Sequence, residues 1–233
     1  LFVVARRRND GDQRRVVTHH LLDLISPQER FSAGEYGRQA RQIIARLGDQ
    51  GTPLVLVGGS GMYVDATVDG FGASPEADSQ LRSQLEIRWL TEGPEALHGD
   101  LARREPEIAS RLNVTDRSRI LRALELLEQT GRGVAPPAGQ HPIRPRPLLV
   151  ALHRPREQLY QRIERRIDAM MHRGWLAEVE DLLAMGISAS SPGIESLGYG
   201  ELVSHLRGKG TLEWAIDQIG RKTRRYAKRQ TTW

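Results

Sequence analysis

Cysteine is absent from this 233-residue chain, which excludes a disulfide framework and thiolate metal sites. Long apolar runs are also absent, since none approaches the roughly 20 residues that a membrane-spanning helix needs. The lack of cysteine suits a reducing cytoplasm, and no signal peptide is readable in the chain. Because the first residue is Leu1 rather than Met, we expect the natural chain to begin further upstream.

Charge is plentiful, with a modest excess of basic residues, 34 against 29 acidic ones. Charged residues make up 27% of the chain and hydrophobic residues 39%, which is typical of a folded protein with one substantial core. The net charge of +5 and the pI of about 9.9 favour an anionic partner. Only three of the 34 basic residues are lysine, and GC-rich codon usage would explain that excess of arginine equally well. The placement of the charges is therefore more informative than their number.

The first third of the chain has an α/β pattern. Ser32 is a predicted N-cap with Glu35 completing a capping box, and apolar residues repeat at helical spacing as far as Leu47. Residues 53–57 form a fully apolar run, which predicts a strand buried on both faces of a parallel sheet. Residues 21–25 and 148–152 are further candidate strands. The order of these segments predicts the α/β class.

The rest of the chain is predicted to be helical. From residue 78 to 131 only helical patterns occur, and after residue 152 helices are expected over 156–173, 175–185, 195–206 and 212–229. We therefore predict an α/β core over residues 1–77, a helical insertion domain over 78–137, and the remainder of the core with C-terminal helices over 138–233.

A glycine-rich loop follows the predicted strand at 53–57 and precedes a predicted helix at 62–68. Gly58, Gly59 and Gly61 would let backbone N–H groups face an anion at the helix N-terminus, and Ser60 adds a hydroxyl there. A simple tight turn explains the glycines about as well. The loop is not a Walker A motif, because no Gly-Lys-Ser/Thr follows it.

Arginine placement supplies two further candidate sites. Arg166 borders the apolar stripe of its predicted helix, so it either pairs with a distant carboxylate or clamps a phosphate or diphosphate. The final helix carries six cations within residues 221–229 and no acid among them, which favours a nucleic-acid backbone over a membrane surface or an acidic partner. A second basic set, at Arg117, Arg119 and Arg122, follows a Thr115-Asp116 cap. The pair His19 and His20 lacks a visible third metal ligand, so we expect a structural role for it.

Seven segments, in this order, resemble the tRNA dimethylallyltransferase family, also called tRNA isopentenyltransferases or IPP transferases. The resemblance covers the chain from about residue 16 to its end. The matching stretches are His19-His20-Leu-Leu-Asp23, Phe31-Ser-Ala-Gly-Glu-Tyr36, Leu56-Val-Gly-Gly-Ser-Gly-Met-Tyr63, Asp116-Arg-Ser-Arg-Ile-Leu-Arg-Ala-Leu-Glu125, Leu159-Tyr-Gln-Arg-Ile-Glu-Arg-Arg-Ile-Asp168, Leu197-Gly-Tyr199, and Thr223-Arg-Arg-Tyr-Ala-Lys-Arg-Gln230 with Thr232-Trp233.

The resemblance implies a P-loop-NTPase-like parallel sheet core and an activity. A dimethylallyl group would move from dimethylallyl diphosphate to N6 of the adenosine 3′ of the anticodon, in a tRNA whose anticodon stem-loop is splayed so that the target base is flipped out. The resemblance also implies nucleotide (ATP) binding, Mg²⁺ with ligands outside this chain, a cytoplasmic location and a monomer.

Site residues are implied in the same way. Ser60 takes the catalytic position at the channel, where the family usually has threonine, and the diphosphate would face Gly58, Gly59, Ser60 and Arg166. Gly200 departs from the basic residue common at its position. The implied tRNA contacts are Arg82, Ser118, Arg119, Ile120, Leu121, Arg122, Glu195, Ser196, Leu197, Gly198, Tyr199, Gly200, Lys228, Arg229, Gln230, Thr231, Thr232 and Trp233.

Three departures from the family pattern concern the ends of the chain. The P-loop and the aspartate that takes the amine proton lie upstream in the family and are not in this chain. Relatives continue past Trp233. The residues from Val4 to Asp10 do not match the stretch that the family conserves just before the histidine pair. We therefore expect a fragment that is inactive by itself. A non-catalytic RNA-binding remnant of the family is the alternative, and a P-loop kinase of the nucleoside or shikimate type is a weaker one because it gives the basic helices no role.

Overall fold

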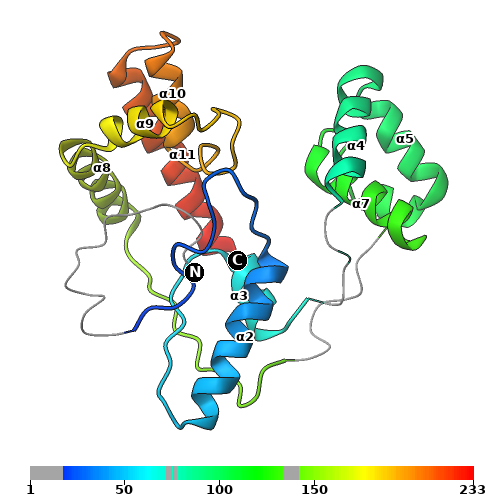
Figure 1. The fold of residues 1–233 in the computed structure, drawn as a ribbon, viewed down its shortest axis with the longest axis horizontal. Coiled ribbons are helices and arrows are strands. Elements are labelled where there is room, and N and C mark those ends of the chain that lie inside the picture. Colours follow the sequence, from blue (N-terminus) through cyan, green and yellow to red (C-terminus); the bar gives the residue numbers. More distant parts are fainter. Residues whose placement is uncertain (1–17, 72–74, 76–77, 134–141) are drawn as a thin grey trace. The chain divides into compact units, whose positions relative to one another are not determined.

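The computed structural model describes residues 18–71, 75, 78–133 and 142–233. The chain divides into two compact units, and each is described by itself below (Figure 1). The core unit comprises residues 1–68 and 143–233, and the insertion unit comprises residues 69–142. The Val4–Asp10 stretch lies outside the described residues.

In the core unit, α2 (Ala33–Asp49) packs against α3 (Gly61–Val68), as Figure 1 shows. The Ser32 hydroxyl accepts a hydrogen bond from the Glu35 N–H at 3.0 Å, which confirms the predicted N-cap. The Glu35 carboxylate accepts from the Gln39 amide at 2.6 Å. Gly37 permits the close approach of the two helices, since a Cβ there would lie 2.6 Å from the Ala66 carbonyl oxygen.

The helices after residue 155 share one apolar core in the core unit. Its buried members include Ile163, Ile167, Trp175 and Ile219. Three of the four helices begin where the sequence predicts, whereas α10 begins four residues later because residues 195–198 form turns. None of the described helices is long and apolar enough to cross a membrane. The bounds of these helices are α8 (Arg156–His172), α9 (Trp175–Ala184), α10 (Tyr199–Leu206) and α11 (Leu212–Thr232).

The insertion unit is helical wherever the structure describes it. Its core is formed by fully buried residues such as Leu97 and Leu101 of α5 and Ile120 of α7. The Asp116 carboxylate caps α7 by accepting from the Arg119 N–H at 3.3 Å. The helices are α4 (Ser79–Glu92), α5 (Pro94–Arg104), α6 (Pro106–Ala109) and α7 (Arg117–Thr130).

The predicted strands are not paired. Within the described ranges no residue is in a strand, so the parallel sheet core is not confirmed. Residues 53–57 and 148–152 have no regular secondary structure, and most of their apolar side chains are exposed: Val55 to 83%, Val150 to 73% and Leu152 to 97%. An extended segment satisfies its backbone N–H and C=O groups only against a neighbouring strand, and the described residues supply none.

The buried tyrosine pair Tyr36 and Tyr63, between α2 and α3, should make the folded state less stable at alkaline pH. Burial raises the pKa of Tyr36 from its usual 10.0 to about 12, with the neighbouring Tyr63 adding to the shift. The folded state therefore holds this proton more tightly than the unfolded state, so stability is intact below pH about 10 and falls as the pH rises toward about 12. We expect Tyr36→Phe to lose less stability across this window than the wild type does, measured by urea unfolding at each pH.

A Tyr226→Phe variant is the control, because that side chain is 38% exposed. Its unfolding should follow the wild-type pH dependence. Identical curves for Tyr36→Phe and the wild type would contradict the assignment.

Candidate functional site

The glycine loop leads directly into α3, as the sequence predicts. The Ser60 carbonyl accepts hydrogen bonds from the N–H groups of Tyr63 and Val64 at 3.1 and 3.2 Å, and these bonds start the helix. The Ser60 side chain is partly buried, and its hydroxyl has no hydrogen-bond partner among the described residues. Ser60 therefore lies at the N-terminus of a helix with a hydroxyl able to bind a ligand.

The C-terminal end of α11 lies against this loop. The Gly59 carbonyl accepts hydrogen bonds from the Gln230 amide at 2.7 Å and from the Tyr226 hydroxyl at 3.4 Å. The Trp233 indole N–H donates to the Asp65 carboxylate at 3.3 Å. A Cβ at Gly61 would lie 2.4 Å from the Trp233 ring. Glycine at 61 is thus required for the approach of this chain's own C-terminal residues, a role the sequence reasoning missed.

Arg166 is exposed on α8, between the buried Ile163 and Ile167 along the chain. It therefore borders the buried stripe, and the alternative of an ion pair with a distant carboxylate is not seen among the described residues. Its guanidinium is available at the surface of the core unit.

In the insertion unit, two arginines of the predicted tRNA surface converge on one buried carboxylate. Glu125 is 1% exposed, and its Oε2 lies 3.0 Å from Arg122 Nη1 and 3.5 Å from Arg82 Nη1. Its Oε1 accepts from the Asp78 N–H at 3.0 Å. The two arginines remain 28% and 33% exposed. Much of their charge is therefore balanced inside the unit. The sequence spacing did not predict that Arg82, Arg122 and Glu125 form one cluster.

The rest of the predicted contact segment in α7 is divided between surface and core. Ser118 and Arg119 are exposed, although Arg119 is also within 3.5 Å of Asp116. Ile120 and Leu121 are fully buried, so their side chains face the core of the insertion unit.

The segment from Glu195 to Gly200 is mostly structural in its contacts. Gly198 has a positive φ of 101°, and a Cβ there would lie 2.2 Å from the Trp175 ring, so only glycine fits. Tyr199 is buried and donates from its hydroxyl to Glu178 at 3.0 Å. Glu195 and Leu197 are exposed, while Ser196 and Gly200 are partly buried.

The cations of α11 differ in their partners. Lys222 is paired with the buried Glu201, whose carboxylate also accepts from the Gly198 N–H at 3.1 Å. Arg221 lies 2.7 Å from Asp217. Arg225 and Lys228 have no ion pair within the part of the chain that the structure describes. An unbalanced positive surface therefore remains on the later turns of α11.

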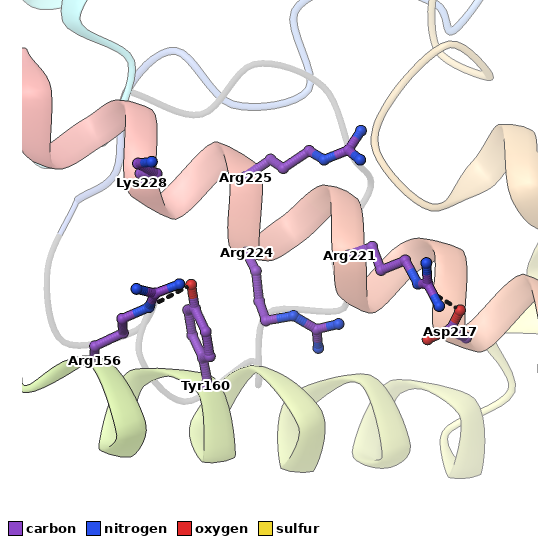
Figure 2. Close-up of a pocket in the computed structure, with 7 residues that line it drawn as sticks. All are labelled: Arg156, Tyr160, Asp217, Arg221, Arg224, Arg225 and Lys228. Carbon is purple, nitrogen blue, oxygen red and sulfur yellow. Dashed lines mark hydrogen bonds and ion pairs between the residues drawn. The ribbon is translucent and has the colours of Figure 1, made fainter.

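A pocket of about 490 Å³ lies beside this surface, between α8 and α11 (Figure 2). Its lining residues are Arg156, Tyr160, Asp217, Arg221, Arg224, Arg225 and Lys228. Sequence reasoning missed the contribution of α8, because the cations of two separate helices meet here only in the folded chain.

No metal centre is formed by the described residues. They contain no group of three or more His, Asp or Glu side chains placed to hold an ion. His19 and His20 are both exposed. The side chains described here thus do not fit a Mg²⁺ site of their own.

A cationic helix face beside a glycine loop that opens a helix is typical of proteins that bind phosphate-bearing ligands. The comparison with known families agrees with this class, because the IPP transferase family model matches residues 5–233. The chain belongs to the IPP transferase family.

Curated relatives and solved structures carry the family's names. A tRNA dimethylallyltransferase of Syntrophobacter fumaroxidans is 43% identical over 224 residues, covering 95% of this chain and 66% of the relative. The full-length tRNA isopentenylpyrophosphate transferase of Bacillus halodurans aligns with a TM-score of 0.64 and 34% identity, over 96% of this chain and 70% of that one. A eukaryotic dimethylallyltransferase acting on tRNA shares the fold with a TM-score of 0.78 at 22% identity, over 97% of this chain and 58% of that one. This chain therefore spans about two thirds of the length of several proteins it matches.

The Glu125 cluster should be a main stabilising contact of the insertion unit. Glu125→Gln keeps the shape of the side chain but leaves Arg82 and Arg122 without their buried carboxylate. Because both arginines are partly hydrated, we expect a loss of about 2 kcal/mol rather than the full cost of breaking a buried pair. Urea unfolding monitored by circular dichroism measures it.

The matched control is Glu128→Gln, the same substitution one turn further along α7. Glu128 is 46% exposed and paired with Arg104 at the surface, so its loss should cost at most about 1 kcal/mol. Equal destabilisation by the two substitutions would show that the buried cluster is not special.

Proposed function

We propose that this chain forms the tRNA-binding and donor-binding part of a tRNA dimethylallyltransferase. The reaction moves the dimethylallyl group of dimethylallyl diphosphate to N6 of the adenosine 3′ of the anticodon. One observation carries the proposal: the unbalanced cationic surface of α11 continues into a helix end that is hydrogen-bonded to the glycine loop. An RNA held on α11 would therefore be positioned next to the Ser60 hydroxyl.

The tRNA partner follows from the charge of that surface. Arg225 and Lys228 lie on α11 without a carboxylate partner among the described residues, and phosphate groups would supply the missing negative charge. In the insertion unit Arg119 is 74% exposed, whereas Arg82 and Arg122 are already paired with Glu125. We infer that α11 supplies most of the electrostatic attraction.

The donor is bound through its diphosphate in this proposal. N6 forms a bond to C1 of the dimethylallyl group as the C1–O bond breaks, the diphosphate leaves with the electron pair, and the N6 proton passes to a base. A leaving diphosphate needs its charge neutralised, and Arg166 is the exposed guanidinium that we assign to this role, with Ser60 orienting the reacting groups. We expect the base to be the family's aspartate, which lies outside the segments matched here.

Several further features are part of the proposal. We propose that residues 53–57 and 148–152 are strands of a P-loop-like parallel sheet, because their exposed valines and leucines need to be covered by neighbouring strands. Mg²⁺ would bind the donor's phosphates and ligands outside the described residues, which form no metal cluster of their own, and nucleotide would likewise bind outside them. We further propose that the protein acts as a cytoplasmic monomer.

Charge reversal on α11 tests the RNA surface. Arg225→Glu combined with Lys228→Glu should weaken binding of an anticodon stem-loop by at least tenfold at ~0.1 M salt. The slope of log affinity against log salt should also become shallower, by the amount that corresponds to the loss of about one to two phosphate contacts. Fluorescence anisotropy with a labelled stem-loop at several salt concentrations measures both quantities.

The control makes the same change in net charge elsewhere in the core unit. Arg207 and Lys209 are exposed in the turn after α10, so Arg207→Glu with Lys209→Glu should alter affinity only slightly. The proposal is refuted if the α11 pair behaves like this control. Tight binding without any transfer by a chain extended to the full length of its relatives would instead favour the RNA-binding remnant.

Arg166 is tested by separating donor binding from RNA binding. Arg166→Ala should lower the affinity for dimethylallyl diphosphate about tenfold, because one charge-assisted contact is lost, and should leave stem-loop affinity nearly unchanged. Isothermal titration measures the first and anisotropy the second. Arg165→Ala removes the neighbouring exposed arginine and serves as the control. A large loss of RNA affinity on Arg166→Ala would contradict the donor role.

A further inference from the structure

The pocket between α8 and α11 contains more positive charge than the protein itself balances (Figure 2). Five of its lining side chains are cationic and only Asp217 is acidic. That carboxylate lies 2.7 Å from Arg221 and is thereby engaged. Arg224 lies 3.6 Å from Glu164, a carboxylate that is 62% exposed and therefore holds it weakly. No carboxylate within the described ranges pairs with the remaining three cations.

Tyr160 gives the pocket a defined geometry. The Arg156 Nε–H donates to the Tyr160 hydroxyl at 2.9 Å, and the guanidinium carbon of Arg156 lies 5.1 Å from the ring centroid. The guanidinium carbon of Arg224 lies 5.7 Å from the same centroid. Figure 2 shows the Tyr160 side chain between these two arginines, one from each helix. Contact with the ring thus positions one guanidinium from each helix at the pocket, where both can donate charge-assisted hydrogen bonds to an anion bound beside the ring.

We propose that this pocket is a subsite for one phosphate group of the RNA backbone, held by Arg156 from α8 and Arg224 from α11. This inference rests on the proposed function and deepens it, because it adds α8 to the RNA surface. The pocket shares Arg225 and Lys228 with the α11 surface, so a phosphate chain on that surface reaches the pocket without a break. A free phosphate or diphosphate has the same chemistry, and the experiment distinguishes it.

The first arm measures RNA affinity. Arg156→Gln combined with Arg224→Gln should reduce stem-loop affinity several-fold to about tenfold at ~0.1 M salt, and should lower the slope of log affinity against log salt by about 0.7 to 0.9, the value for one phosphate. Arg207→Gln with Lys209→Gln is the control of equal charge change, and it should leave the slope unaltered. Circular dichroism establishes that each variant is folded.

The second arm uses a substitution that is expected to raise RNA affinity rather than lower it. Glu164→Gln removes the carboxylate that competes for Arg224, so it should raise stem-loop affinity about twofold to threefold. A purely structural role for the α8–α11 contacts predicts a loss of affinity or no change for Glu164→Gln as well. An increase with Glu164→Gln, together with a decrease in the double arginine variant, supports the subsite.

The third arm identifies the source of the phosphate. Modification of Arg156 and Arg224 by phenylglyoxal, followed by mass spectrometry, should be suppressed by the stem-loop and not by inorganic phosphate or diphosphate at concentrations of about 1 mM. Protection by diphosphate with unchanged RNA affinity of the double variant would overturn the proposal in favour of a small-anion site. Absence of protection by either probe would also overturn it.

The binding measurements distinguish a wrong phosphate subsite from a wrong proposed function. A wild-type chain that binds no stem-loop refutes both. A wild-type chain whose binding depends on Arg225 and Lys228, but not on Arg156 and Arg224, refutes only the subsite.

Discussion

Among the residues that the structure describes, two buried carboxylates hold three cations that would otherwise be available to a ligand. Glu125 in the insertion unit takes Arg82 and Arg122, and Glu201 in the core unit takes Lys222. A buried carboxylate is costly unless it is paired and hydrogen-bonded, so these contacts are structural requirements of the fold. The cations on the later turns of α11 and Arg156 at the start of α8 are among those left without such a partner. The electrostatic surface is therefore a consequence of how each unit stabilises its own interior.

The end of α11 connects this surface to the glycine loop. Hydrogen bonds from Gln230 to Gly59 and from Trp233 to Asp65 join residues about 170 positions apart in the chain. The glycines at 59 and 61 leave the space that these side chains occupy. A loop whose sequence indicates a phosphate cradle is thus also a docking point for the helix that carries the basic surface, and the two roles are compatible because the bonds use the Gly59 carbonyl rather than the loop's N–H groups.

The exposed apolar segments agree with membership of a family whose solved structures are longer than this chain. Residues 53–57 and 148–152 have the composition of buried parallel strands, but within the described ranges most of their side chains are not covered. For the helices, the predicted and the observed secondary structure agree. A helix satisfies its backbone hydrogen bonds within its own segment and needs only an apolar face against a neighbour. Local periodicity was therefore a better guide for helices than for strands.

The amino-acid sequence by itself determined the helices, their caps at Ser32 and Asp116, the one-sided charge of α11 and the family to which the chain belongs. These properties depend on contacts between residues close together in the chain or on motifs in a fixed order. Only the tertiary structure decided that Arg82 and Arg122 share Glu125, that Arg166 faces outward, and that Arg156 and Tyr160 meet Arg224 in one pocket. Those facts depend on which helix faces pack together, and the partners of a charge across a helix interface cannot be deduced from its neighbours in sequence.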